Sequence, residues 1–311
     1  MAASFSTACQ GKSAAVSCPL CAGQETEIYS DGEDKELAAS ALGSSRRDIS
    51  HGKIMRCLNC GLGFRQLRPA ENELASLYRE LAPEVYEKES RGRVRTARRH
   101  LRIVERYISE GRVLDVGCAS GAFLYSAAAA GWSVVGVEPA EILCGKAKHL
   151  LGNRGQVLCQ PLQQADLPSS SFDAITLWDV LEHVLNPVGF FSLCASLLKP
   201  GGYLFANVPD LDSVQARLLR ERWPLLLAEH LNYFNRASLR LCGDKAHLQW
   251  ITFGQRPAVF SLEYVFYRLA QHKIAGASVA HEIVRKTFLR DICAPVFLGE
   301  TYGVWKRSAH T

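Results

Sequence analysis

Four cysteines near the start of the chain have the spacing of a metal site. They form two Cys-x-x-Cys pairs, Cys18/Cys21 and Cys57/Cys60, each followed by turn-forming residues. A Cys-x-x-Cys turn presents two thiolates to one ion, and two such turns complete the tetrahedral coordination of a structural Zn²⁺. The alternatives are free thiols or a redox pair. Because two matched pairs favour zinc, we expect a zinc-ribbon lobe over residues 1–70.

A glycine-containing turn indicates a second ligand site. Residues 113–121 read Val-Leu-Asp-Val-Gly-Cys-Ala-Ser-Gly, which predicts a strand, a tight turn and a helix start. Gly117 and Gly121 would let the backbone approach a ligand closely. An alanine replaces the second glycine of the dinucleotide fingerprint, which disfavours a nicotinamide-dependent oxidoreductase. Glu138, 23 residues after Asp115, follows the next predicted strand, where an acid can bind ribose hydroxyls.

Two histidines are candidates for acid–base chemistry. Asp179, Glu182 and His183 are spaced i, i+3 and i+4, so on a helix they would share one face. This run would hold Mg²⁺ or Zn²⁺, or Asp179 would orient His183 as a general base; the alternative is local capping and core packing. His230, beside Glu229, is the second candidate base, and its alternative is a surface-loop residue.

These residues need a scaffold, and the apolar pattern predicts one. From Arg112 onward short apolar runs alternate with helical periods, which predicts a parallel sheet with helices on both faces. The expected strands are 112–116, 133–137, 156–159, 172–178, 202–208, 248–254 and 300–307. The expected helices are 71–81, 94–109, 121–130, 140–150 and 188–198, with amphipathic stretches at 261–270 and 279–290.

The composition excludes several classes of protein. The chain has 311 residues, of which 48% are hydrophobic and 22% charged, so it is neither disordered nor collagen-like. No apolar run approaches the roughly 18 residues that cross a bilayer, and the start lacks a signal-peptide pattern. A net charge of +5 does not require an anionic partner. The odd count of eleven cysteines favours a reducing, cytoplasmic compartment over a disulfide framework, and most of the seven cysteines outside the two pairs are expected to be unpaired core residues.

Four motifs in order resemble a known family. After residues 113–121 and Glu138, the chain continues with Ser-Phe-Asp-Ala-Ile-Thr-Leu-Trp-Asp-Val-Leu-Glu-His-Val at 171–184 and Leu-Lys-Pro-Gly-Gly-Tyr-Leu-Phe at 198–205. Together they resemble the class I S-adenosylmethionine-dependent methyltransferases over about residues 95–255. The resemblance implies a Rossmann-like, seven-stranded and mostly parallel α/β sheet whose last strand runs antiparallel.

The resemblance also implies which residues bind S-adenosylmethionine. The implied cofactor-binding residues are Asp115, Gly117, Gly121, Glu138, Leu162 and Trp178. The first three would line the methionine part, Glu138 would hold the ribose, and the segment 160–163 would approach the adenine. Trp178 and Asp179 would face the transferring methyl group.

The region before these motifs resembles one branch of the superfamily. A zinc ribbon, a segment with Tyr78 and Tyr86, and Glu-His-Leu-Asn-Tyr-Phe at 229–234 are similar to bacterial enzymes that methylate small molecules. Ubiquinone-biosynthesis O-methyltransferases show a similar acid-x-x-Glu-His run and bind a divalent ion with it. The resemblance therefore implies methyl transfer to a small-molecule acceptor, most simply at a hydroxyl oxygen, with His183 or His230 as the base.

Other acceptors remain open at this point. An RNA methyltransferase would use the zinc lobe with the basic run 91–102, but these arginines fall on the polar face of an amphipathic helix, and a solvated face is their simpler explanation. Methylation at carbon or nitrogen of a sugar or natural-product intermediate is a further alternative. We expect a methyltransferase domain over 71–311, with a helical lead-in at 71–110 and an insert at 255–295 that, with the zinc lobe, closes over the acceptor. The oligomeric state is not predicted.

Overall fold

Seven strands form one mixed sheet in the computed structural model, which describes residues 17–34, 37, 51–79, 90–255, 257–271 and 275–309. In order across the sheet they are β10 (Leu248–Gln255), β13 (Glu300–Arg307), β8 (Leu198–Pro209), β7 (Phe172–Trp178), β4 (Arg112–Val116), β5 (Ser133–Val137) and β6 (Gly155–Leu158). β13 is antiparallel to both of its neighbours, and the other pairs are parallel. The predicted sheet, including its antiparallel last strand, is confirmed.

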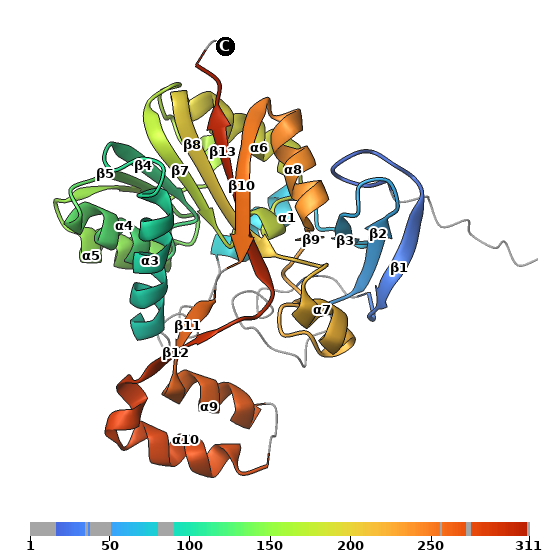
Figure 1. Cartoon of the computed structure of the whole chain (residues 1–311), viewed down its shortest axis with the longest axis vertical. Helices are drawn as coiled ribbons and strands as arrows, with labels where there is room; N and C mark the ends of the chain where they lie inside the picture. The colour runs from blue at the N-terminus through green and yellow to red at the C-terminus, as the bar shows by residue number, and fades with distance from the viewer. Residues whose placement is uncertain are drawn as a thin grey trace, which may run out of the picture.

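Helices cover both faces of this sheet because its strands are apolar on both sides. On β4, Val113 packs into one core cluster, whereas Leu114 and Val116 pack into the other, as the period of two requires. On the Val113 side lie α3 (Ser90–Val104), α4 (Ala122–Ala129) and α5 (Glu141–Leu151). On the opposite side lie α6 (Pro187–Leu197) and α8 (Arg236–Lys245) (Figure 1).

A second, four-stranded sheet belongs to the cysteine-rich lobe. Its strands are β1 (Thr26–Asp31), β2 (Lys53–Cys57), β3 (Gly63–Arg65) and β9 (Asn232–Tyr233). β9 lies more than 160 residues after β3 in the chain and pairs with it. The lobe also shares its apolar core with the large sheet, since Leu62, Phe64 and Phe234 belong to the same buried cluster as Leu114 and Val116 of β4. Most of the residues expected to link β1 and β2 lie outside the described part of the chain.

The remaining elements lie around the two sheets. They are α1 (Glu71–Arg79), α7 (Val214–Leu219), β11 (Ala258–Ser261), α9 (Leu262–Gln271), α10 (Ala277–Arg285) and β12 (Cys293–Val296), with short 3₁₀ turns at Leu162–Gln164, Leu181–His183, Arg220–Arg222 and Phe288–Asp291. α9 and α10 project from the body at the lower end of Figure 1. Their base rests on α3, where the backbone N–H of Val259 donates to the Thr96 hydroxyl at 3.0 Å.

Helix α3 carries the basic run, and its two sides differ sharply. Ala97 and Leu101 are buried against the core, whereas Arg95 and Arg102 are exposed. This arrangement agrees with a solvated polar face. None of the helices in the described part of the chain is long and apolar enough to cross a membrane.

Candidate active site

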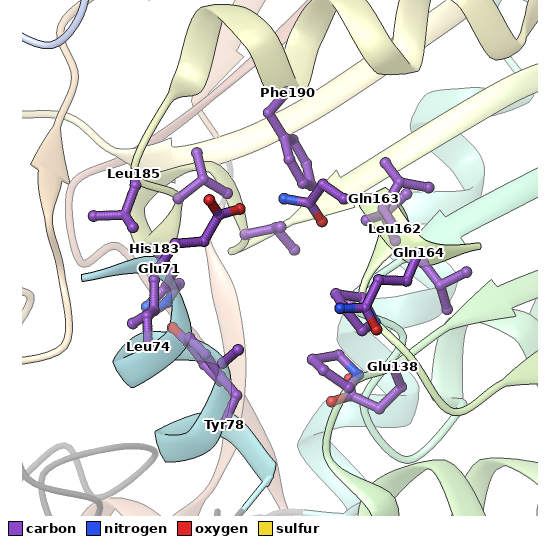
Figure 2. A pocket seen from close by; sticks show the side chains of 18 of the residues that line it. Glu71, Leu74, Tyr78, Glu138, Leu162, Gln163, Gln164, His183, Leu185 and Phe190 are labelled. Carbon is purple, nitrogen blue, oxygen red and sulfur yellow. The ribbon is translucent and has the colours of Figure 1, made fainter. Parts of the chain in front are cut away.

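A pocket of about 960 Å³ lies over the carboxyl ends of β4, β5 and β7. Its cofactor half, as the resemblance assigns it, is lined by Gly117, Ala119, Glu138, Leu143 and Leu162–Gln164. The opposite half is lined by Glu71, Leu74 and Tyr78 of α1 and by Asp179–Val180 and His183–Asn186 after β7. Figure 2 shows Tyr78 and His183 on one wall, facing Glu138 and Gln164 on the other.

The closure of the N-terminal lobe and the insert over the acceptor stays a prediction, because the described lining comes from other segments. No described residue of 1–70 or 255–295 is among those that line the pocket. The insert follows β10 in the chain, whereas the pocket lies over the carboxyl ends of β4, β5 and β7. Among the described elements, the helix α1 lines this side of the pocket. Tyr86 lies outside the described residues.

Hydrogen bonds and close packing hold the glycine turn and Glu138 in place in the cofactor half of the pocket. The carboxylate of Glu138 accepts hydrogen bonds from the backbone N–H of Ala119 at 2.8 Å and of Ala140 at 2.9 Å. Burial raises the pKa of Glu138, while these two hydrogen bonds lower it. Gly117 has φ +67°, and a Cβ there would lie 2.8 Å from a methyl of Val180. The turn therefore requires glycine both for its backbone angle and for its close packing.

Two residues predicted beside them lie outside the pocket lining. Asp115 is buried, and its carboxylate accepts a hydrogen bond from the Thr176 hydroxyl at 2.7 Å. Burial raises the pKa of Asp115 to about 7. Gly121 begins α4 with φ +84°, and a Cβ there would lie 3.1 Å from Ala147 of α5. Gly121 thus allows α4 and α5 to pack closely behind the turn.

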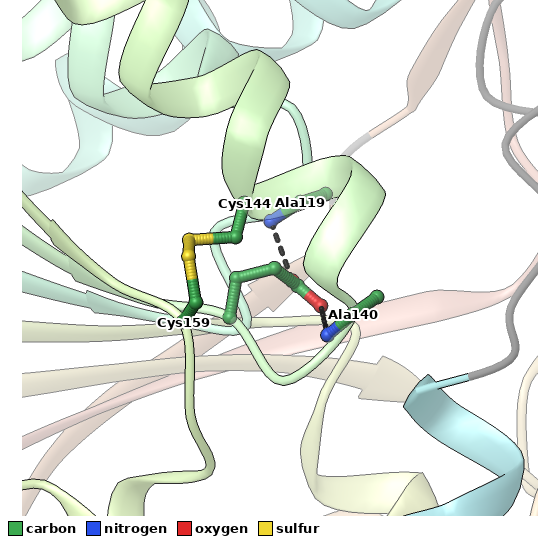
Figure 3. Close-up of a disulfide and its surroundings, with 5 residues drawn as sticks. Ala119, Ala140, Cys144 and Cys159 are labelled. Atoms are coloured by element: carbon green, nitrogen blue, oxygen red, sulfur yellow. Dashed lines mark hydrogen bonds between the residues drawn. A yellow bond between two sulfur atoms is a disulfide. The ribbon is translucent and has the colours of Figure 1, made fainter.

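The loop after β6 forms the side of the pocket assigned to the adenine. Leu162 is buried in a 3₁₀ turn and lines the pocket with Gln163. A disulfide joins Cys159, at the start of this loop, to Cys144 of α5 (Figure 3). This bond corrects the expectation for these two cysteines, whereas Cys118, Cys194 and Cys242 are buried and unpaired as expected. The two cysteines meet because β5, α5 and β6 bring them together, and a separation of 15 residues carries no such signal.

Asp179 does not share a helix face with Glu182 and His183, contrary to the prediction. The chain after β7 has left-handed backbone angles at Asp179, with φ +58°, and then makes a single 3₁₀ turn. The carboxylate of Asp179 accepts a hydrogen bond from the side-chain amide of Asn207 at 2.6 Å. Asp179 lines the pocket next to Val180 and the glycine turn, where the two halves meet.

Glu182 and His183 are joined by His230 instead. One ligand atom from each of these three residues lies within 4.8 Å of the other two. The Nδ1 atom of His183 lies 3.1 Å from the carbonyl of Glu229, and Nδ1 of His230 lies 3.0 Å from that of Leu225. Donation from both Nδ1 atoms leaves both Nε2 lone pairs available, which is the usual arrangement in metal-binding histidines.

Burial disfavours the charged form of each residue in this cluster. It raises the pKa of Glu182 well above its ordinary value and lowers the pKa of His183 to about 4. Burial and the proximity of His183 lower the pKa of His230 as well. The Oε2 atom of Glu182 has no hydrogen-bond partner among the described residues. A divalent cation would reverse this balance because it stabilises the carboxylate.

Trp178 occupies a different environment from the one expected. Its ring stacks on His100, with centroids 3.8 Å apart and planes 8° from parallel, and it also contacts Phe123. Trp178 is not among the residues that line the pocket. Its side chain packs in the core between β7 and α3, so the carboxyl end of β7 presents Asp179 to the pocket instead.

The four cysteines of the N-terminal lobe converge on one point. Their sulfur atoms all lie within 4.8 Å of one another, and the pairs Cys18–Cys60 and Cys21–Cys57 are 3.6 and 3.5 Å apart. A tetrahedron with Zn–S bonds of about 2.3 Å has edges of about 3.8 Å. The thiols are therefore spaced as zinc ligands, and the residues present fit a structural ion.

The fold and these residues define the class of protein. The family described as "Methyltransferase domain" matches residues 86–252, more than half of the chain. The chain therefore belongs to this family, and the prediction of a class I S-adenosylmethionine-dependent methyltransferase is confirmed.

Named relatives agree over a shorter stretch. The chain is 40% identical over 100 residues to the ubiquinone biosynthesis O-methyltransferase of Dechloromonas aromatica, covering 31% of this chain and 43% of the relative. The corresponding enzyme of Xanthomonas axonopodis is 43% identical over 100 residues, covering 31% and 42%. The chain thus aligns with less than half the length of these relatives.

A solved structure shares the fold. A chain of the complex between the Haloferax volcanii Trm112 methyltransferase activator and a methyltransferase superimposes with a TM-score of 0.51 at 15% identity. The superposition covers 69% of this chain and 91% of that one. At this identity the likeness concerns the fold alone.

Proposed function

We propose that this protein transfers the methyl group of S-adenosylmethionine to a hydroxyl oxygen of a small-molecule acceptor. The observation that carries the proposal is one pocket that joins the glycine turn and Glu138 to a second half containing His183. In the bound cofactor the sulfonium carries its own leaving group, so the protein must mainly align the acceptor and exclude water. The ubiquinone-biosynthesis relatives are O-methyltransferases, which supports oxygen as the methylated atom.

We assign Glu138 to the ribose hydroxyls and the backbone around Gly117 to the methionine part of the cofactor. Leu162 would contact the adenine. Two of the carboxylate's lone pairs are already used by backbone N–H groups, which holds the side chain in place for a ribose. Asp179, held by Asn207, lines the pocket, and its carboxylate would favour the positive charge of the bound sulfonium.

We further propose that His183 or His230 removes the acceptor's proton; of the two, His183 lines the pocket, whereas His230 is buried and is not among the lining residues. Each has its Nδ1 directed at a backbone carbonyl, so a neutral imidazole would keep Nε2 free to accept a proton. One ring nitrogen of each histidine and a carboxylate oxygen of Glu182 lie within 4.8 Å of one another and fit a divalent cation, which would lower the pKa of a bound hydroxyl. Activity that survives in both His183→Ala and His230→Ala would exclude a histidine in either role.

A phosphate-rich acceptor such as RNA finds less support. None of the described residues that line the pocket is a lysine or arginine, whereas Glu71, Glu138, Asp179 and Glu229 are acidic. Anionic acceptors would be repelled by these carboxylates, so an uncharged or cationic small molecule suits the pocket better.

We propose that the cysteine cluster binds one structural Zn²⁺. The sulfur spacing supports this, and with four protein ligands the ion would stabilise the lobe rather than take part in the reaction. A cytoplasmic location is also proposed, and the eight described cysteines that are not in disulfides favour it. In that compartment the Cys144–Cys159 bond would be open to reduction.

The function is tested first by cofactor binding and then by product analysis. Calorimetry should show binding of S-adenosylhomocysteine that Glu138→Ala weakens strongly, because a buried charge-assisted contact is lost. Incubation with ¹³C-methyl-labelled S-adenosylmethionine and a small-molecule extract should yield a labelled methoxy carbon by NMR. A label on nitrogen, on carbon or in the RNA fraction would contradict oxygen transfer to a small molecule.

A further inference from the structure

Arg68 connects the zinc lobe to the active site. It lies between β3, which ends at Arg65, and α1, which begins at Glu71. Its Nη2 atom donates to the carbonyls of Val184 at 3.3 Å and Leu185 at 2.8 Å. Its Nη1 atom donates to the carbonyl of Leu231 at 3.0 Å and to the side-chain oxygen of Asn232 at 3.1 Å.

The four oxygen atoms belong to two segments that carry the proposed chemistry. Val184 and Leu185 follow His183 directly, and Leu231 and Asn232 follow His230. Asn232 reinforces the connection, since its amide donates to the carbonyls of Leu181 at 3.3 Å and Val184 at 2.7 Å. The backbone N–H of Leu231 also donates to the carbonyl of Glu182 at 2.8 Å. Arg68 and Asn232 thus hold the loop after β7 against the segment that carries β9.

This arrangement depends on the shape of the guanidinium group. One planar group reaches four oxygen atoms on two segments, which the single ammonium of a lysine cannot do with the same geometry. None of the described acidic residues forms an ion pair with Arg68, so its contacts are to neutral oxygens. Burial lowers the pKa of Arg68 to about 10, so the group remains a cationic donor near neutral pH.

Arg68 also lies next to two walls of the pocket, one along the chain and one through its hydrogen bonds. Three positions after Arg68, α1 begins, and its residues Leu74 and Tyr78 form one side of the acceptor half. His183 and Leu185, on the loop that Arg68 holds, form the adjacent side. A shift of Arg68 would therefore move both sides, whereas Glu138 and the glycine turn lie on other elements.

We propose that Arg68 is a positioning residue through which the zinc lobe aligns the His183 loop and α1 for the acceptor. The inference rests on the proposed methyl transfer for its functional meaning, while the alignment itself can be measured without any acceptor. It assigns the zinc lobe a role in the geometry of the reaction in addition to its stability.

The expected result separates acceptor alignment from cofactor binding. Arg68→Met should leave the affinity for S-adenosylhomocysteine and the zinc content unchanged. Methyl transfer to the extract fraction that supports the wild-type reaction should fall about 100-fold, because a displacement near 1 Å has that effect. Arg68→Lys keeps the positive charge but loses the planar guanidinium group, so its rate should lie between those of the wild type and Arg68→Met. The control is Arg56→Met, since Arg56 lies in the same lobe and pairs with Asp212 at 3.0 Å.

Hydrogen exchange provides the acceptor-independent measurement. Amide exchange in the peptide covering residues 181–186 should rise about tenfold or more in Arg68→Met, with no change over 112–138. Unchanged amide exchange over residues 181–186 in both Arg68 variants would overturn the inference. A fall in S-adenosylhomocysteine affinity as large as the fall in the rate of methyl transfer would also overturn it. A wild-type protein that binds no S-adenosylhomocysteine would refute the proposed function instead, and the exchange data would still decide the role of Arg68. If Arg68→Met does not fold, Arg68→Lys carries the same comparison.

Discussion

Replacing Gly117 by alanine should weaken cofactor binding in addition to destabilising the fold. Gly117 has φ +67°, where an L-residue costs about 1–2 kcal/mol in the free energy of unfolding. The added Cβ would also lie 2.8 Å from a methyl of Val180. Carbon atoms pack at about 3.5–4.0 Å, so Val180 or the turn must move by at least about 0.7 Å.

That movement falls at the junction of the two pocket halves, where Asp179 and Val180 line the cavity. We expect the affinity of Gly117→Ala for S-adenosylhomocysteine to fall about tenfold or more, which corresponds to about 1.4 kcal/mol. The rate of methyl transfer should fall further, by up to about 100-fold, because the donor is displaced by a large fraction of 1 Å.

A second glycine separates backbone strain from the local effect. Gly276, at the start of α10, has φ +77°, and no atom lies within 4 Å of a Cβ built there. Gly276→Ala should therefore destabilise the protein by a similar amount in chemical denaturation, while calorimetry shows unchanged cofactor affinity. Equal affinities of the two variants for S-adenosylhomocysteine would refute the assignment of the turn to the cofactor.

Three further predictions concern the cysteines and the buried acid. Cys18→Ser should remove the bound zinc, seen by elemental analysis, whereas the buried Cys194→Ser should retain it; equal zinc contents would contradict the metal site. Cys159→Ser should lower the free energy of unfolding of the oxidised protein by about 3 kcal/mol, since the disulfide with Cys144 closes a loop of 15 residues, and a dithiol should lower the wild type alone. Burial raises the pKa of Asp115 from 3.8 to about 7, so the folded state holds the proton more tightly and its contribution to stability is lost as pH rises from about 4 to about 7. Asp115→Asn should therefore flatten the pH dependence of unfolding over that range, and an unchanged slope would show that another group is responsible.

Much of the fold could be predicted because its signals are local. The strands β4, β5 and β7 were each expected within the bounds that the structure shows, since apolar runs with short glycine-containing turns have few other solutions. The helix after β7 was the exception. Its i, i+3, i+4 pattern is real in the sequence, but the left-handed backbone at Asp179 and the hydrogen bond from Asn207 direct the chain into one 3₁₀ turn.

The sequence by itself determined the class of fold, the glycine turn with Glu138 and the four cysteines, because each depends on spacings within one or two neighbouring segments. Only the tertiary structure decided that His230 joins Glu182 and His183, and that Arg68 holds both histidine segments. These contacts join residues about 50 to 160 positions apart, as between Arg68 and Leu231. Such neighbours follow from how β3, β7 and β9 meet in space, and the periodicity of a single segment holds no information about that meeting.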